Sequence, residues 1–194
     1  PSLAALYAVK SLLDQGLAFT KRIRFIFGTD EETLWRCMNR YNQIEEKADL
    51  GFAPDSSFPL TYAEKGLLQV KLHGPGWEDR PLQAGRALNV VPDKATYKGE
   101  RLEELLPVIE QSGVNYTEEA GAVTVLGLSK HSKDAAEGVN AIVGLAESLS
   151  LIQPHPALLF IADAVGEDAT GAALFGEIKD EPSGALSFNI ATLS

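Results

Sequence analysis

The sequence predicts an α/β protein in which an α/β segment is followed by an α+β domain with mostly antiparallel strands. In the first part of the chain, apolar residues recur alternately at helical and at strand spacing, which is typical of an α/β sheet. Beyond residues 58–59, shorter alternating runs end at Gly or Pro, which is typical of antiparallel strands and tight turns. We expect the boundary near residue 64, with domains at 1–64 and 65–194.

Two helices and two strands are expected in the first part. Residues 3–15 and 31–46 carry apolar side chains at helical spacing, which predicts two amphipathic helices. Residues 21–27 alternate basic and apolar side chains, the period of a strand with one polar face. Residues 50–53 form a short apolar run before a proline and are predicted to be a buried strand.

The second part is expected to contain more strands than helices. The predicted strands cover residues 66–73, 86–91, 114–118, 122–129, 171–178 and 184–192. The predicted helices cover residues 100–112, 133–150 and 156–165. The last two strands should form a hairpin around residues 181–184, because Pro and Gly mark a turn there.

Composition excludes several classes of partner. The formal net charge is -10, so we expect no nucleic-acid partner, since phosphate backbones are bound by Lys and Arg. An anionic membrane surface would repel the chain for the same reason. The sequence holds one cysteine, which cannot form an intrachain disulfide, and its apolar runs are too short to cross a bilayer. A soluble, cytoplasmic protein is expected.

Two adjacent carboxylates, Glu31 and Glu32, follow the first predicted strand and begin the next predicted helix. Ligands of open α/β sheets bind at the carboxyl ends of strands. One carboxylate could bind a metal there while its neighbour takes a proton from metal-bound water. Thr29-x-x-Glu32 also matches a capping box, and acidic residues favour a helix N-terminus. This segment alone leaves both interpretations open.

Asp55 and His131 are further candidates. Asp55 follows the second predicted strand, and its carboxylate oxygens suit zinc, manganese or magnesium; alternatively, its side chain bonds the backbone of a turn. His131 follows the strand predicted at 122–129 and is either a functional residue or an exposed loop histidine. His73 and His155 are predicted to be surface residues.

Several stretches together resemble the PepV-type dipeptidases. They are residues 27–35 (FGTDEETLW), 51–59 (GFAPDSSFP) and 64–66 (EKG), followed by Gly85-x-x-x-Asn89-x-Val91-Pro92 and Gly127-x-x-x-His131-x(6)-Gly138-x-Asn140-Ala141. The last two resemble motifs of that family's lid domain. The metallopeptidase family in question also contains carnosinases, acetylornithine deacetylase and succinyl-diaminopimelate desuccinylase. The resemblance covers the whole chain.

The resemblance implies a fold and an activity. Residues 1–64 would form part of a zinc-peptidase α/β catalytic domain, and residues 65–194 an incomplete α+β lid domain with a ferredoxin-like antiparallel sheet. The implied reaction is hydrolysis of the peptide bond of a dipeptide, with a small peptide as substrate. The implied cofactors are two zinc ions bridged by a water or hydroxide, with manganese or cobalt as alternatives.

The resemblance also implies roles for individual residues. Glu31 matches the general base, Glu32 a ligand of one metal and Asp55 a ligand of the other. His131 matches a catalytic lid histidine that contacts substrate and helps polarise the scissile carbonyl. Asn89 matches a lid asparagine near the substrate.

The family's pattern is only partly present. Two of its five metal ligands lie in this chain, and both chain ends, at Pro1 and Ser194, are interpreted as cuts through a larger protein. We therefore expect the parent protein to be an enzyme and this chain alone to be inactive. An N-acyl amino acid deacylase and a non-catalytic interaction module remain alternatives, and the oligomeric state stays open.

Overall fold

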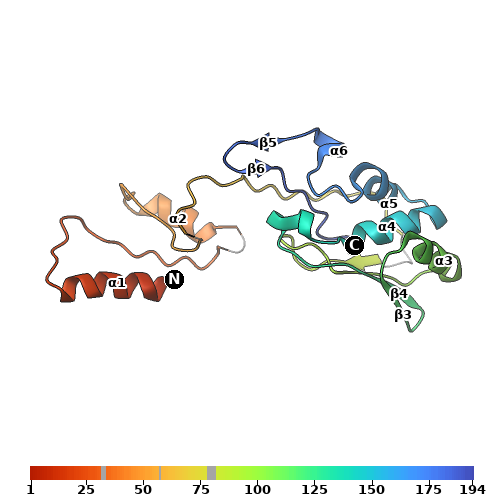
Figure 1. The fold of residues 1–194 in the computed structure, drawn as a ribbon, viewed down its shortest axis with the longest axis horizontal. Coiled ribbons are helices and arrows are strands. Elements are labelled where there is room, and N and C mark those ends of the chain that lie inside the picture. The colour runs from red at the N-terminus through yellow and green to blue at the C-terminus, as the bar shows by residue number, and fades with distance from the viewer. Residues whose placement is uncertain (32–33, 57, 78–81) are drawn as a thin grey trace. The chain divides into compact units, whose positions relative to one another are not determined.

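The computed structural model describes residues 1–194 except 32–33, 57 and 78–81 (Figure 1). The chain divides into two compact units, Pro1–Tyr62 and Ala63–Ser194. Its mixture of helices with antiparallel sheet agrees with the predicted α/β class at that coarse level. Among the described residues, none of the helices has the length and apolar character that crossing a bilayer requires.

The first unit contains helices α1 (Ser2–Asp14) and α2 (Arg36–Ile44). Helix α1 confirms the helix expected at 3–15. Helix α2 begins later than expected, because Trp35 has a left-handed backbone with φ 53° and the helix starts only after it. Thr29 is therefore not the N-cap of α2.

The strands expected at 21–27 and 50–53 are wrong. Both segments lie outside any strand, and no ladder is present among the described residues of the first unit. An alternating sequence forms a strand only when a neighbouring backbone accepts and donates its hydrogen bonds. Without such a neighbour the residues are irregular.

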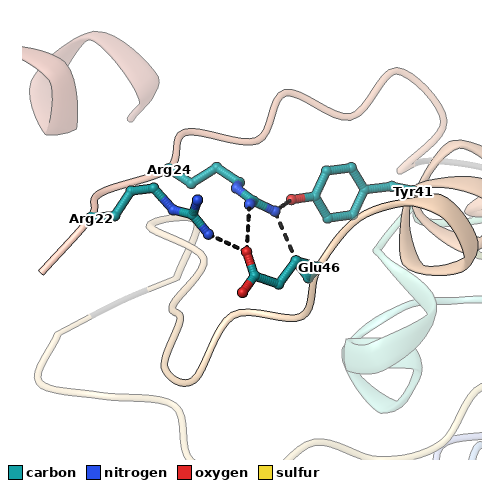
Figure 2. Close-up of polar contacts among 4 residues, drawn as sticks. All are labelled: Arg22, Arg24, Tyr41 and Glu46. Carbon is teal, nitrogen blue, oxygen red and sulfur yellow. Dashed lines mark hydrogen bonds and ion pairs between the residues drawn. The ribbon is translucent and has the colours of Figure 1, made fainter.

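Arginine side chains hold the 21–27 segment against the end of α2 (Figure 2). Arg24 Nη1 donates to the Tyr41 hydroxyl at 2.5 Å and to the Glu46 carbonyl oxygen at 2.9 Å. Arg22 forms an ion pair with the Glu46 carboxylate. The hydrogen bond from Arg22 lowers the pKa of Glu46, so this contact favours the ionised carboxylate.

The second unit is built on a four-stranded antiparallel sheet in the order β1-β2-β4-β3. Its strands are β1 (Leu82–Ala84), β2 (Lys94–Tyr97), β3 (Tyr116–Glu119) and β4 (Ala122–Leu126). Helices α3 (Leu102–Ser112) and α4 (Ala141–Ile152) cover one face of this sheet (Figure 1). Strands β3 and β4 and helix α3 lie within ranges expected from the sequence or within two residues of them.

Alternate strand residues face the helices and form the core. On β2 and β4 the buried residues include Tyr97, Val123 and Val125, while residues between them are at least partly exposed. Helix α4 packs Ile142 and Leu149 against this row, and both are fully buried. The period of two on the strands and the apolar stripes on the helices therefore meet in one core.

Several expected elements differ from the structure. The strands predicted at 66–73 and 86–91 are wrong, although Val90 makes an isolated bridge to His131. The helix expected at 133–150 is interrupted after a 3-10 helix, η1 (Ser132–Glu137), because Val139 pairs with Leu128 before α4 begins.

The C-terminal part also departs from expectation. The helix expected at 156–165 is a short α-helix, α5 (Pro156–Leu159), continued by a π-helical turn, η2 (Phe160–Val165). Where a strand was expected at 171–178, the chain forms helix α6 (Ala172–Phe175). The predicted hairpin is present as β5 (Lys179–Asp180) and β6 (Gly184–Ala185), but the rest of 184–192 is not a strand.

Candidate functional site

Asn89 and His131 lie in two paired segments of the second unit. Val90 and His131 form an antiparallel bridge. Ser132 N donates to the Asn89 carbonyl oxygen at 2.9 Å, and Val91 N donates to the Lys130 carbonyl oxygen at 2.8 Å. The two candidate substrate-contact residues predicted from the sequence thus lie on adjacent backbones, although they are more than 40 positions apart in the chain.

The imidazole of His131 is oriented by the backbone that follows it. Its Nδ1 accepts a hydrogen bond from Lys133 N at 3.3 Å, and His131 is the N-cap of η1. An accepting Nδ1 places the proton of the neutral ring on Nε2. Because His131 is exposed, that N–H is available to donate to a ligand.

Two asparagine amides hold the bridge in place. Asn189 Nδ2 donates to the Val90 carbonyl oxygen at 3.0 Å and to Ser132 Oγ at 3.2 Å. Asn140 Nδ2 donates to Asn189 Oδ1 at 3.0 Å and to the Ile190 carbonyl oxygen at 2.9 Å. Asn140 Oδ1 also caps the first turn of α4, so the bridge is connected to that helix through two side chains.

Asn189 was not predicted as a site residue, and Asn140 was noted only as part of the motif Gly138-x-Asn140-Ala141. The available signal for Asn189 was its place between the apolar residues Phe188 and Ile190. Its side-chain partners lie 49 to 99 positions away in the chain, so spacing could not identify them.

Glycines of the same motifs allow backbones to approach closely. A Cβ on Gly127 would lie 2.1 Å from the Val139 carbonyl oxygen, and one on Gly85 would lie 1.9 Å from the Ala191 carbonyl oxygen. Gly85 also has φ +74°, which side chains rarely adopt. Close packing of the backbone therefore explains why glycine occupies these two positions, without any contact with substrate.

Of the two carboxylates predicted at 31–32, Glu31 lies in an exposed turn and Glu32 falls outside the described residues. Asp30, beside them, is engaged by the start of α2. Its carboxylate accepts from Arg36 Nε at 2.8 Å and from Arg36 N at 2.9 Å. The Arg36 hydrogen bond lowers the pKa of Asp30, which favours its ionised form. This pair was not predicted from the sequence.

Asp55 is exposed on an irregular segment of the first unit. Nearby, the hydroxyls of Ser56 and Thr61 lie 2.6 Å apart. Among the described residues, no hydrogen bond or ion pair joins Glu31 to Asp55, and no three His, Cys, Asp or Glu side chains gather as a metal-binding group. Glu31 and Asp55 offer the oxygen donors that divalent metals accept, but the described residues do not by themselves complete a centre.

The other two histidines differ from one another. His73 is exposed, as expected. His155 is half-buried, which corrects its expected place on the surface: its Nδ1 accepts from Ala157 N at 3.2 Å, and its ring packs edge-on against Trp77 at 4.8 Å. His155 therefore caps α5 and contributes to packing.

A pocket of about 240 Å³ lies beside the asparagine pair, at the start of α4. Its polar rim includes Asn140, Asn189 and Asp168. The Asp168 carboxylate accepts from Thr170 Oγ1 at 2.6 Å and from Ala173 N at 2.9 Å. These bonds, the Thr170 hydroxyl first, lower the pKa of Asp168 to about 2. These three side chains of the rim are thus hydrogen-bonded within the protein.

Comparison with known proteins relates the whole chain to dipeptidases. No family model matches it. A protein named "Putative dipeptidase YtjP" from Bacillus subtilis (strain 168) is 34% identical over 216 aligned residues, which include 100% of this chain. A protein from Staphylococcus aureus (strain USA300), also named "Putative dipeptidase", is 38% identical over 183 residues, or 84% of this chain. The chain has relatives that are named as dipeptidases.

The matches cover only part of those relatives. The chain spans 46% of the Bacillus subtilis protein and 39% of the Staphylococcus aureus protein. Less than half of each relative's length is therefore represented here. The similarity supports a relationship to a dipeptidase family.

Proposed function

We propose that the full-length protein hydrolyses the peptide bond of dipeptides and that this chain contributes part of the active site. The observation that carries the proposal is the 34% identity to a protein named as a dipeptidase over the whole chain. The paired segments that hold Asn89 and His131 support it, because they bring two candidate substrate contacts onto adjacent backbones.

The proposed roles follow the chemistry of each side chain. His131 donates from Nε2 to the scissile carbonyl oxygen, where negative charge develops as the nucleophile adds. Asn89 contacts the substrate beside it. Glu31 accepts the proton of the attacking water and passes it to the leaving amine. Its exposed position in the turn before α2 leaves its carboxylate accessible to water.

We propose that the reaction depends on a metal pair, with zinc first and manganese or cobalt as alternatives. Glu32 would hold one metal and Asp55 the other, together with ligands from outside this chain. Bound metals would supply a more acidic water and polarise the carbonyl. Zinc calorimetry checks the metal proposal: two sites per full-length protein, weakened by Asp55→Asn, are expected, and unchanged binding in that variant would contradict it.

Activity is tested with the full-length protein, zinc or manganese, and a panel of free and N-acetylated dipeptides. We expect hydrolysis of the free dipeptides. If no dipeptide is hydrolysed, the enzymatic role is contradicted and the non-catalytic interaction module is the remaining alternative. Hydrolysis confined to N-acylated substrates would instead identify a deacylase.

A pair of variants isolates the proposed donor of His131. His131→Asn retains an acceptor near the Nδ1 position but has no group at Nε2, so kcat should fall about 100-fold, as when one such donor is removed. His131→Gln places an amide nearer Nε2 and should retain more activity. His73→Asn, at an exposed histidine, is the matched control. A wild-type kcat in His131→Asn would exclude this role.

A further inference from the structure

We infer that Asn189 is a positioning residue that fixes the geometry of the bridge between Asn89 and His131, with Asn140 fixing Asn189 in turn. The part of this inference that concerns catalysis rests on the proposed function. The part that concerns the bridge rests only on contacts within the second unit.

The contacts of Asn189 reach both sides of the bridge. Its single amide nitrogen donates to Val90 on one segment and to Ser132 on the other. Val90 directly follows Asn89, and Ser132 directly follows His131. Moving this amide would therefore shift both candidate substrate contacts together.

Apart from its two backbone hydrogen bonds, the bridge has no support from a continuous strand ladder. It consists of one isolated pair, Val90 and His131, outside the four-stranded sheet. Asn89 is half-buried and His131 is exposed, so neither is fixed by deep burial in the core. Side-chain hydrogen bonds therefore carry a larger share of the positioning than they would inside the sheet.

Asn140 completes the connection to a rigid element. Its amide nitrogen donates to Asn189 Oδ1, while its own oxygen accepts from Ile142 N in the first turn of α4. Helix α4 is the most buried helix of the unit. The orientation of the Asn189 amide is thus set by a fixed donor, which leaves its Nδ2 directed to Val90 and Ser132.

Asn189→Asp tests the inference, because it keeps the shape and removes the donor. The new carboxylate would also repel the Val90 carbonyl oxygen. In the 194-residue chain, we expect hydrogen exchange at the Val91 and Ser132 amides to rise about tenfold, the effect of losing one hydrogen bond of ordinary strength. Amides between β2 and β4 should remain protected. Asn189→Ala, which removes the donor without adding charge, should show the same local pattern.

Two controls separate positioning from loss of stability. Asn115→Asp makes the same chemical change at an exposed residue before β3. Ile109→Val trims the core on α3 and should lower stability without selective exchange at the bridge. Equal loss of protection across β2 and β4 in both Asn189 variants would overturn the inference, as would unchanged exchange at Val91 and Ser132.

Kinetics of the full-length protein provide the second readout. Because a small displacement of a catalytic group can cost about 100-fold in rate, Asn189→Asp should lower kcat by about 10- to 100-fold and change KM less than about threefold. Ile109→Val should leave kcat at the wild-type value. An unchanged kcat in Asn189→Asp would refute the catalytic part. An inactive wild-type protein would refute the proposed function instead, while the exchange experiment would still decide the positioning of the bridge.

Discussion

Glu147 on α4 is a carboxylate whose ionisation opposes folding. Burial, and next the negative charge of Glu167, raise its pKa above the ordinary value. The loop that carries Glu167 lies close, since a Cβ on Gly166 would be 3.9 Å from Glu147 Oε1. A carboxyl group with a raised pKa in the folded state binds protons more tightly there than in the unfolded chain. The stabilisation from the protonated Glu147 carboxyl is complete below the pKa that the group has in the unfolded chain. It is lost as pH rises through the pKa that the group has in the folded state.

Glu147→Gln should therefore raise the Tm of the 194-residue chain at pH 7. The gain should shrink as pH falls towards and below 4.5, the ordinary value of the group, because Glu147 is then protonated and uncharged like glutamine. Thermal unfolding between pH 4 and 8 measures it. Glu177→Gln, at an exposed glutamate, is the matched control. A gain that does not vary with pH, or a lower Tm at pH 7, would contradict the argument.

Some residues of the candidate site were predicted from the sequence, and others were not. Asn89 and His131 were found through motifs, and the structure adds that their backbones pair. Asn189 was missed because its partners are the Val90 carbonyl and Ser132. Long-range hydrogen bonds of this kind leave no period in a sequence. The roles assigned to Glu31, Glu32 and Asp55 stay predictions.

Among the elements, helices α1 and α3 were predicted best, each within two residues of its observed bounds. Helix α3 buries Leu105 and Ile109, four positions apart, and this spacing is visible in the sequence. The interruption before α4 was missed, although Gly138 and the N-cap residue Asn140 lie there in the sequence. It arises because Leu128 and Val139 exchange two backbone hydrogen bonds. Strand pairing, which the pattern of one segment cannot specify, decided the outcome there. Strand pairing also explains why residues 86–91 do not form the predicted strand: β1 and β2 lie on either side of them and pair with each other.

Gly127→Ala tests how much the close approach of the backbone at residue 127 to the Val139 carbonyl oxygen contributes to stability. A Cβ there would meet the Val139 carbonyl oxygen at 2.1 Å and Ala141 N at 3.0 Å. Both are backbone atoms, so the loop or the start of α4 would have to move. We expect a loss of about 1–3 kcal/mol in the free energy of unfolding, as for other overpacked sites. Denaturant titration of the 194-residue chain measures it.

Gly74→Ala is the control for that substitution, since a Cβ on Gly74 has nothing within 4 Å. It should change the free energy of unfolding by less than about 0.5 kcal/mol, as is usual for surface changes. Equal stability of Gly127→Ala and Gly74→Ala would show that the backbone at residues 127 and 139 can separate without cost.

In the whole molecule, burial is confined to one unit. Every buried apolar residue of the described chain lies between Leu82 and Val165. Within the first unit, by contrast, neither helix has a buried residue, and Phe52 and Phe58 are 84% and 98% exposed. Hydrophobic burial is the main favourable term in folding, so the second unit supplies the stability of the chain.

A polypeptide of residues 63–194 should therefore unfold in one cooperative transition, with a Tm within about 4 °C of that of residues 1–194, a difference of roughly 1 kcal/mol. Calorimetry of both chains measures this. Leu149→Ala, which removes a fully buried side chain of α4, should cost about 2–5 kcal/mol in each. A second transition in the longer chain, or a fall in Tm of more than about 10 °C on removing residues 1–62, would show that the first unit contributes folding energy of its own. Equal effects of Leu149→Ala in both chains would place the cooperative core in the unit that carries His131 and Asn189.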